Sequence, residues 1–125
     1  MIQAHKALDA ASRACREGGT IILLAECPDG MGRTDFLDWF DAKDSQGLTE
    51  KLCDKYQVNG QTAWSLLKKA ERFHVEIATA IDHAEAKKMR LRKVEVSRIA
   101  ELAGPAGPMG YIMTNGAKTA VRLEN

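Results

Sequence analysis

Four residues that could bind a ligand follow a short apolar run directly. The run from Thr20 to Ala25 leads into Glu26, Cys27, Asp29 and Gly30. A carboxylate there could orient a ligand hydroxyl, and glycine amides allow an anion to approach the backbone closely. The same residues also fit an ordinary turn, in which Asp29 closes the turn and Cys27 packs as a small apolar side chain. These four residues are therefore candidates for lining a cleft, with both interpretations open.

A second candidate pair lies near the N-terminus, where Gln3 and Lys6 are spaced i, i+3. In a helix this spacing places both side chains on one face. An amide and an ammonium group could together hold a substrate carboxylate and its neighbouring oxygen. The alternative is that both are solvated polar residues on the outside of a helix.

The cysteines and histidines do not predict a disulfide framework or a metal site. The three cysteines are odd in number and widely spaced: Cys15, Cys27 and Cys53. The three histidines lack the spacing of metal ligands: His5, His74 and His83. A thiol enzyme using Cys27 would need a nearby base, and the sequence places no histidine beside it.

Composition indicates a soluble globular chain that forms a single domain over residues 1–125. Apolar residues make up 45% and charged residues 28% of the 125 residues, and the formal net charge is +1. This balance provides no bulk attraction to nucleic acid or to an anionic membrane. No signal peptide or membrane-spanning run is apparent in the sequence, so we expect a cytoplasmic protein.

The hydrophobic pattern predicts helices alternating with strands. Helices are expected at 3–17, 48–56, 63–73, 84–89 and 98–103, and a further short helix is expected to begin after a cap at Thr34. Strands are expected at 20–25, 74–79, 93–96, 111–114 and 119–123. The last two would form a hairpin around Asn115-Gly116. The pattern predicts an α/β fold, a three-layer domain with a small, mostly parallel sheet and an antiparallel edge hairpin.

The strongest amphipathic pattern covers residues 63–73. Its apolar stripe includes Trp64 and Phe73, which we expect in the core. Lys68 and Lys69 lie off the stripe and are expected to face water. Asn59-Gly60 is expected to interrupt the helical pattern before this helix.

Four segments occur in an order that suggests a family. They are Gln3-Ala4-His5-Lys6-Ala7, Gly18 to Ile22, Ala25 to Gly32 with Phe36 after it, and Gly104 to Lys118. This ordered set resembles the C-terminal domain of the nickel-pincer lactate racemase family. The most specific parts are the Q-x-x-K and C-x-D-G-x-G motifs.

The resemblance implies a role in a two-domain enzyme. A longer N-terminal domain, absent here, would bind the nickel-pincer nucleotide, and no cofactor is expected on this chain alone. That cofactor would take a hydride from a small 2-hydroxy acid while a histidine takes the hydroxyl proton. By the motif, Gln3 and Lys6 would hold the substrate carboxylate and oxygen as the domains close. The chain would be inactive on its own as part of a racemase or epimerase.

Two points stay open at the level of sequence. Ile2 stands where some members of the family have an aromatic residue, and Trp64 cannot be aligned with a tryptophan that lines the pocket in some members. The substrate is therefore not identified beyond its class. The alternative is a stand-alone α/β module that binds a small anion or a partner protein without catalysis.

Overall fold

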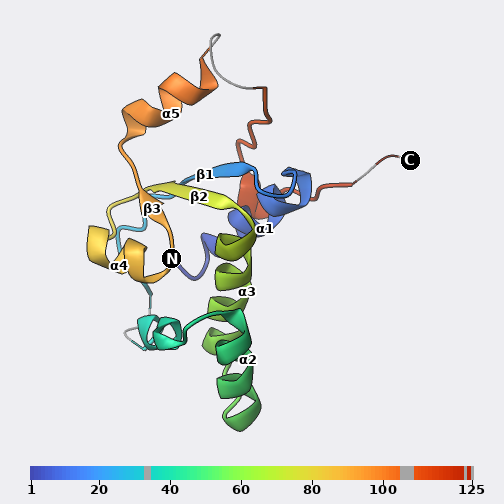
Figure 1. Ribbon diagram of the computed structural model, residues 1–125. Helices are drawn as coiled ribbons and strands as arrows, with labels where there is room; N and C mark the ends of the chain where they lie inside the picture. The colour runs from blue at the N-terminus through green and yellow to red at the C-terminus, as the bar shows by residue number, and fades with distance from the viewer. Residues whose placement is uncertain (33–34, 105–108, 123, 125) are drawn as a thin grey trace.

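Among the residues that it describes, the computed structural model has three strands, five α-helices and two 3-10 helices (Figure 1). The structure describes residues 1–32, 35–104, 109–122 and 124. The helices are α1 (His5–Ala14), α2 (Ser45–Asp54), α3 (Val58–Arg72), α4 (His83–Lys88) and α5 (Val96–Ala103), with 3-10 helices η1 (Leu37–Asp41) and η2 (Gly116–Lys118). The strands are β1 (Thr20–Leu24), β2 (His74–Ala78) and β3 (Arg92–Lys93). Within these ranges, no helix has the length and apolar character needed to span a membrane.

The sheet is parallel throughout, with strand order β1-β2-β3. Thr20 pairs with His74 and Leu24 with Ala78, and Glu76 of β2 pairs with Arg92 of β3. Helices supply both crossovers, because parallel neighbours cannot be joined by a tight turn. The predicted α/β class with a small parallel sheet is confirmed.

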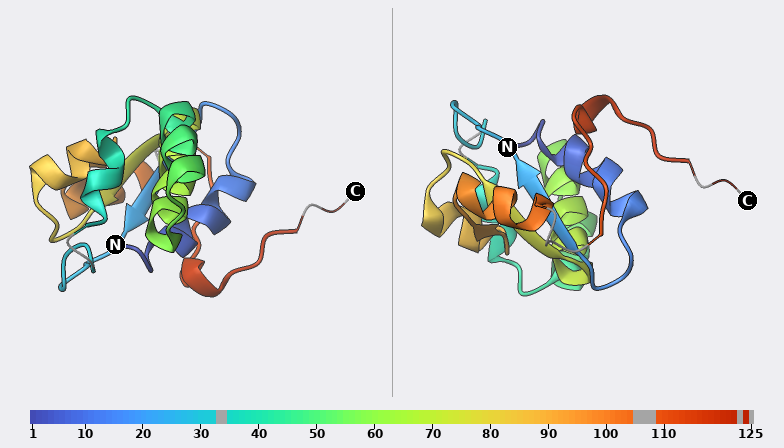
Figure 2. Two further views of the ribbon diagram at one scale, coloured as in Figure 1. Left: turned by 90° about the horizontal axis from the view of Figure 1, so that it is seen from below. Right: turned by 90° about the horizontal axis from the view of Figure 1, so that it is seen from above.

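The main core lies between the sheet and the helices α1 and α3 (Figure 2). Alternate residues of the two long strands point into it: Ile21, Leu23, Val75 and Ile77. The predicted aromatic cluster closes one end, where Phe36 and Phe40 meet edge to face with ring centroids 5.4 Å apart. Phe73 is also buried, as predicted, whereas the expected cap at Thr34 lies outside the described residues.

The predicted break at Asn59-Gly60 is wrong, because both residues belong to the first turns of α3. Gly60 is buried, and a Cβ atom there would lie 2.7 Å from Leu52 Cδ2 and 2.8 Å from the Trp39 ring. This glycine therefore allows η1, α2 and α3 to pack closely. The preceding helix also begins earlier than expected, at Ser45, because Asp44 caps it by accepting a hydrogen bond from the Gly47 amide.

The predicted closing hairpin is also wrong. In the described part of 109–122 there is no strand, and residues 116–118 form η2, which packs on α1. A Cβ atom at Gly116 would lie 3.0 Å from Ala7 Cβ, so the two backbones approach closely. Packing against a helix therefore overrides the β-propensity of this segment. The predicted strand at 93–96 is reduced to β3, because α5 already begins at Val96.

Candidate functional site

The residues just before Gln3 contact the loop that contains the other predicted site residues, at the carboxyl edge of the sheet. The α-amino group of Met1 donates a hydrogen bond of 3.0 Å to the Gly30 carbonyl, and Ile2 Cδ1 would lie 3.9 Å from a Cβ at Gly32. Figure 2 shows the N-terminus beside the loop that follows β1. The segment that contains Gln3 therefore packs on the loop that contains Glu26 to Gly30, at the edge where parallel sheets place their ligands.

The loop after β1 is a tight turn fixed by its backbone. The Glu26 carbonyl accepts hydrogen bonds from the Ala80 amide at 2.9 Å and from Thr79 Oγ1 at 3.3 Å. Cys27 and Gly30 have positive φ angles of 50° and 68°, and the Gly30 amide donates to the Cys27 carbonyl. At position 30 this conformation favours glycine.

The side chains of this loop differ in exposure. Glu26 and Asp29 are exposed, while Cys27 is partly buried and packs against the core. This packing agrees with the interpretation of Cys27 as a small apolar residue. The role of Glu26, Cys27, Asp29 and Gly30 in lining a cleft stays a prediction.

Gln3 and Lys6 occupy one end of α1, and both are exposed. Gln3 lies in the turn before the helix, and its carbonyl accepts a hydrogen bond of 3.2 Å from the Lys6 amide. The first turn of α1 contains no acidic residue, so the positive end of the helix dipole is not offset there. This end of α1 therefore favours an anion, whereas the roles of the two side chains stay predictions.

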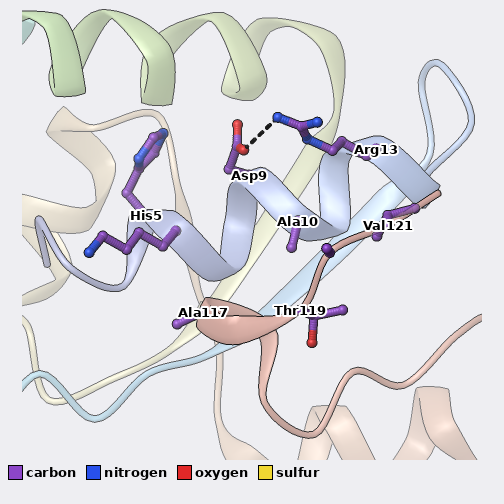
Figure 3. Close-up of a pocket in the computed structure, with 9 residues that line it drawn as sticks. His5, Asp9, Ala10, Arg13, Ala117, Thr119 and Val121 are labelled. Carbon is purple, nitrogen blue, oxygen red and sulfur yellow. Dashed lines mark hydrogen bonds and ion pairs between the residues drawn. The ribbon is translucent and has the colours of Figure 1, made fainter.

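A pocket of about 400 Å³ runs along α1 beside Lys6 (Figure 3). Its lining comes from one face of α1 and from the C-terminal segment: His5, Lys6, Asp9, Ala10, Arg13, Ala117, Thr119, Ala120 and Val121. Lys6 and Arg13 outnumber the single carboxylate, Asp9, which is itself paired with Lys69 at 3.0 Å. The balance of charge in the pocket is positive and suits a small anion.

The prediction that Lys69 faces water is wrong, because this residue of α3 is only 8% exposed. Its Nζ atom lies 3.0 Å from Asp9 Oδ1 and donates to Ser65 Oγ at 2.6 Å. The amphipathic pattern assigns Lys69 to water because the pattern of one helix cannot show that α1 packs there and supplies a carboxylate. A buried ammonium is tolerated when it is paired and hydrogen-bonded in this way.

His5 joins the same polar cluster between α1 and α3. Its Nε2 atom lies 3.1 Å from Ser65 Oγ and 3.4 Å from Lys69 Nζ. Burial, together with the positive charge of Lys69, lowers the pKa of His5 from 6.5 to about 4, and the charge of Asp9 offsets this only in part. Burial alone would raise the pKa of Asp9, but the hydrogen bond and charge of Lys69, assisted by Arg13, lower it instead.

The sequence contains one signal for this cluster. Ser65 and Lys69 are spaced i, i+4 and border the apolar stripe of α3. His5 and Asp9 have the same spacing on the first helix. Two such polar pairs on helices that pack together indicate a polar contact between the helices.

The remaining candidate groups are the possible metal ligands, the cysteines and Trp64. In residues 1–32, 35–104, 109–122 and 124, no three His, Cys, Asp or Glu side chains gather as metal ligands would. The three cysteines are free, and Cys53 is exposed. Trp64 packs partly on the core, with Lys68 Nζ 4.8 Å from its ring centroid.

Comparison with known proteins gives consistent results. Residues 1–102 match the family described as lactate racemase C-terminal domain. A stretch of 54 residues is 41% identical to lactate racemase from Thermoanaerobacterium thermosaccharolyticum, covering 42% of this chain and 13% of that protein. The solved lactate racemase apoprotein from the same organism shares the fold with a TM-score of 0.69 and 28% identity, over 82% of this chain and 26% of that chain. The chain therefore corresponds to a minor part of each relative.

Proposed function

This chain belongs to the lactate racemase C-terminal domain family, and on that premise we propose that it is the substrate-binding domain of a 2-hydroxy-acid racemase or epimerase. The match over residues 1–102 carries the proposal. The domain would act together with a cofactor-bearing N-terminal domain. Because such a site is completed only when two domains close, the chain alone would not turn over substrate.

In this proposal, the start of α1 binds the acid. The Lys6 ammonium pairs with the substrate carboxylate, and the Gln3 amide donates to the neighbouring oxygen. Three observations support this: both side chains are exposed, they lie one turn apart, and the pocket beside Lys6 has a positive balance of charge. The loop from Glu26 to Gly30 packs on the same segment and would form one wall of the cleft.

The nickel-pincer nucleotide of the family would supply hydride transfer at the carbinol carbon. The described residues of this chain do not fit a metal-binding role, since none of their His, Cys, Asp and Glu side chains form a group of three. We therefore assign cofactor binding to the companion domain. The contribution of this chain is to bind and orient the 2-hydroxy acid.

The test combines this chain with its companion domain loaded with cofactor. We expect racemisation of lactate or another 2-hydroxy acid only when both parts are present. A companion domain that racemises equally well alone would contradict the proposal. If the pair is inactive but the chain still binds a small carboxylate, the result would favour a non-catalytic anion-binding module.

A further inference from the structure

We propose that His5 presents a neutral Nδ1–H donor to the pocket beside Lys6. Three neighbours act as positioning residues that fix this tautomer: Ser65, Lys69 and Asp9. The proposal deepens the proposed function and rests on it for the identity of the ligand, a small carboxylate. The hydrogen-bond geometry itself comes from this chain alone.

The first step is the direction of the hydrogen bonds that start at Lys69. The Lys69 ammonium is buried and forms an ion pair with Asp9 Oδ1 at 3.0 Å. An ammonium group only donates, so Lys69 donates to Ser65 Oγ at 2.6 Å. The hydroxyl hydrogen of Ser65 is then free to point at His5 Nε2, which lies 3.1 Å away. Lys69 therefore donates to Ser65, and Ser65 donates to His5 Nε2.

The second step fixes the protonation state of the imidazole. His5 Nε2 accepts from Ser65 and also lies 3.4 Å from Lys69 Nζ. A hydrogen on Nε2 would point at a positive charge, so Nε2 stays unprotonated. A neutral imidazole has one N–H, and it must then be at Nδ1.

The charged groups around His5 agree with a neutral ring. On its own helix these are Lys6, Asp9 and Arg13. The charged α-amino group belongs to Met1, whose carbonyl accepts a hydrogen bond from the His5 amide. On α3 the facing charge is Lys69. The lining residues of the C-terminal segment are uncharged: Ala117, Thr119, Ala120 and Val121. Burial and Lys69 lower the pKa of His5 to about 4, so the ring is neutral at pH 7.

The third step is the accessibility of Nδ1. His5 lines the pocket together with Lys6, and Figure 3 shows the His5 side chain at the N-terminal end of α1. Among the described residues no protein group bonds to Nδ1, and this atom is not one of the buried polar atoms that lack a partner. An accessible donor next to an ammonium group matches a carboxylate, which accepts several hydrogen bonds.

The direct test is 15N NMR of the His5 ring in the full chain at pH 7. We expect Nδ1 to be protonated and Nε2 unprotonated. Lys69→Met should raise the pKa of His5 toward 6.5, whereas Lys68→Met on the exposed side of α3 should leave it unchanged. A ring protonated at Nε2, or at both nitrogens, would overturn the proposal. The wild-type spectrum decides this even if a variant fails to fold.

A second test uses the chain assembled with its companion domain. His5→Asn places an amide nitrogen near the Nδ1 position, and His5→Gln reaches toward Ser65 instead. We expect KM to stay within about threefold for His5→Asn and to rise about tenfold for His5→Gln. A residue that only anchors α1 to α3 would give the reverse order. Either the reverse order or equal losses would overturn the donor role.

These outcomes are separate from the proposed function itself. If Lys6→Ala leaves turnover unchanged, the proposed function fails, whatever the tautomer of His5. If Lys6→Ala abolishes turnover while His5→Asn and His5→Gln behave alike, only the inference about His5 fails.

Discussion

The two faces of the sheet are held to their helices by different forces. On one face, Leu23 is 6% exposed and lies in the core beneath α1 and α3. On the other face, its neighbour Leu24 is 66% exposed. The helix α5 stands on this second side (Figure 1). The first face is closed by apolar packing, and the second is only lightly covered.

On the second face, ion pairs rather than apolar packing connect the sheet to α5. Glu76 has a side chain that is 7% exposed and lies 3.5 Å from both Arg92 of β3 and Arg98 of α5. Its Oε2 atom accepts no hydrogen bond from the described residues. The candidate site therefore lies on the face that is closed by apolar packing, where α1 contacts both β1 and α3.

The largest expected effect is a difference in the free energy of unfolding between substitutions on the two faces. Leu23→Ala should lower the free energy of unfolding by about 2–5 kcal/mol, because it leaves a cavity in the core. Leu24→Ala should change it by less than about 0.5 kcal/mol, because the side chain is exposed. Urea denaturation of the two neighbours measures this difference. Equal losses would show that α5 packs on its face as tightly as α1 and α3 pack on theirs.

The packed face should also be the pH-sensitive one. The folded-state pKa of His5 is about 4, below its usual 6.5, so the unfolded chain binds the proton first as the pH falls. The stability contributed by the neutral ring is present above pH 6.5 and is lost between pH 6.5 and 4. After allowing for solvent screening, we expect a loss of about 2 kcal/mol. Urea midpoints at pH 7 and pH 4.5 measure it, and His5→Gln should flatten the dependence.

A smaller effect is expected where charge attaches α5. Glu76→Gln keeps the size of the side chain but removes its charge, so the pairs with Arg92 and Arg98 are lost. We expect about 1 kcal/mol of destabilisation and faster amide hydrogen exchange in α5. The matched control is Glu101→Gln, which removes an exposed partner of Arg98 at 3.7 Å and should change little. Unchanged exchange in the Glu76 variant would contradict attachment by charge.

The smallest effect concerns the C-terminal wall of the pocket. Gly116→Val would place a Cβ atom 3.0 Å from Ala7 Cβ and should displace residues 116–121 from α1. The cost should be under about 1 kcal/mol, because the segment is mostly exposed. NMR contacts between the segment and α1 measure the displacement. Gly110→Val is the control, since a Cβ atom there meets nothing within 4 Å.

The sequence predicted the packed face better than the rest of the molecule. The long strands were located within one residue, because a buried parallel strand is a continuous apolar run between clear breaks. Gly60 was misinterpreted because a glycine that permits close helix packing has the same local pattern as one that ends a helix. The closing hairpin failed because its turn and β-branched residues are local signals, whereas η2 depends on a distant contact with Ala7.

The candidate site shows the same division. The spacing of Gln3 and Lys6 is visible in the sequence, but α1 begins at His5, so Gln3 lies in the preceding turn, where its carbonyl accepts from the Lys6 amide. The roles of the two side chains stay predictions. The cluster of His5, Ser65 and Lys69 joins residues about sixty positions apart, and the sequence marks it only by the i, i+4 spacing of the polar residues within each helix. Polar contacts between helices become visible only once the packing of α1 on α3 is known.

The central claim is that Lys6 binds the substrate carboxylate, and the most direct measurement is kcat/KM for 2-hydroxy-acid racemisation by the chain assembled with its companion domain. Lys6→Ala should lower kcat/KM on the order of 10²-fold or more, because a charged hydrogen-bond donor to the reacting acid is lost. Lys87→Ala, at an exposed position on α4, should leave it unchanged. Equal kcat/KM values for the Lys6 and Lys87 variants would contradict the claim.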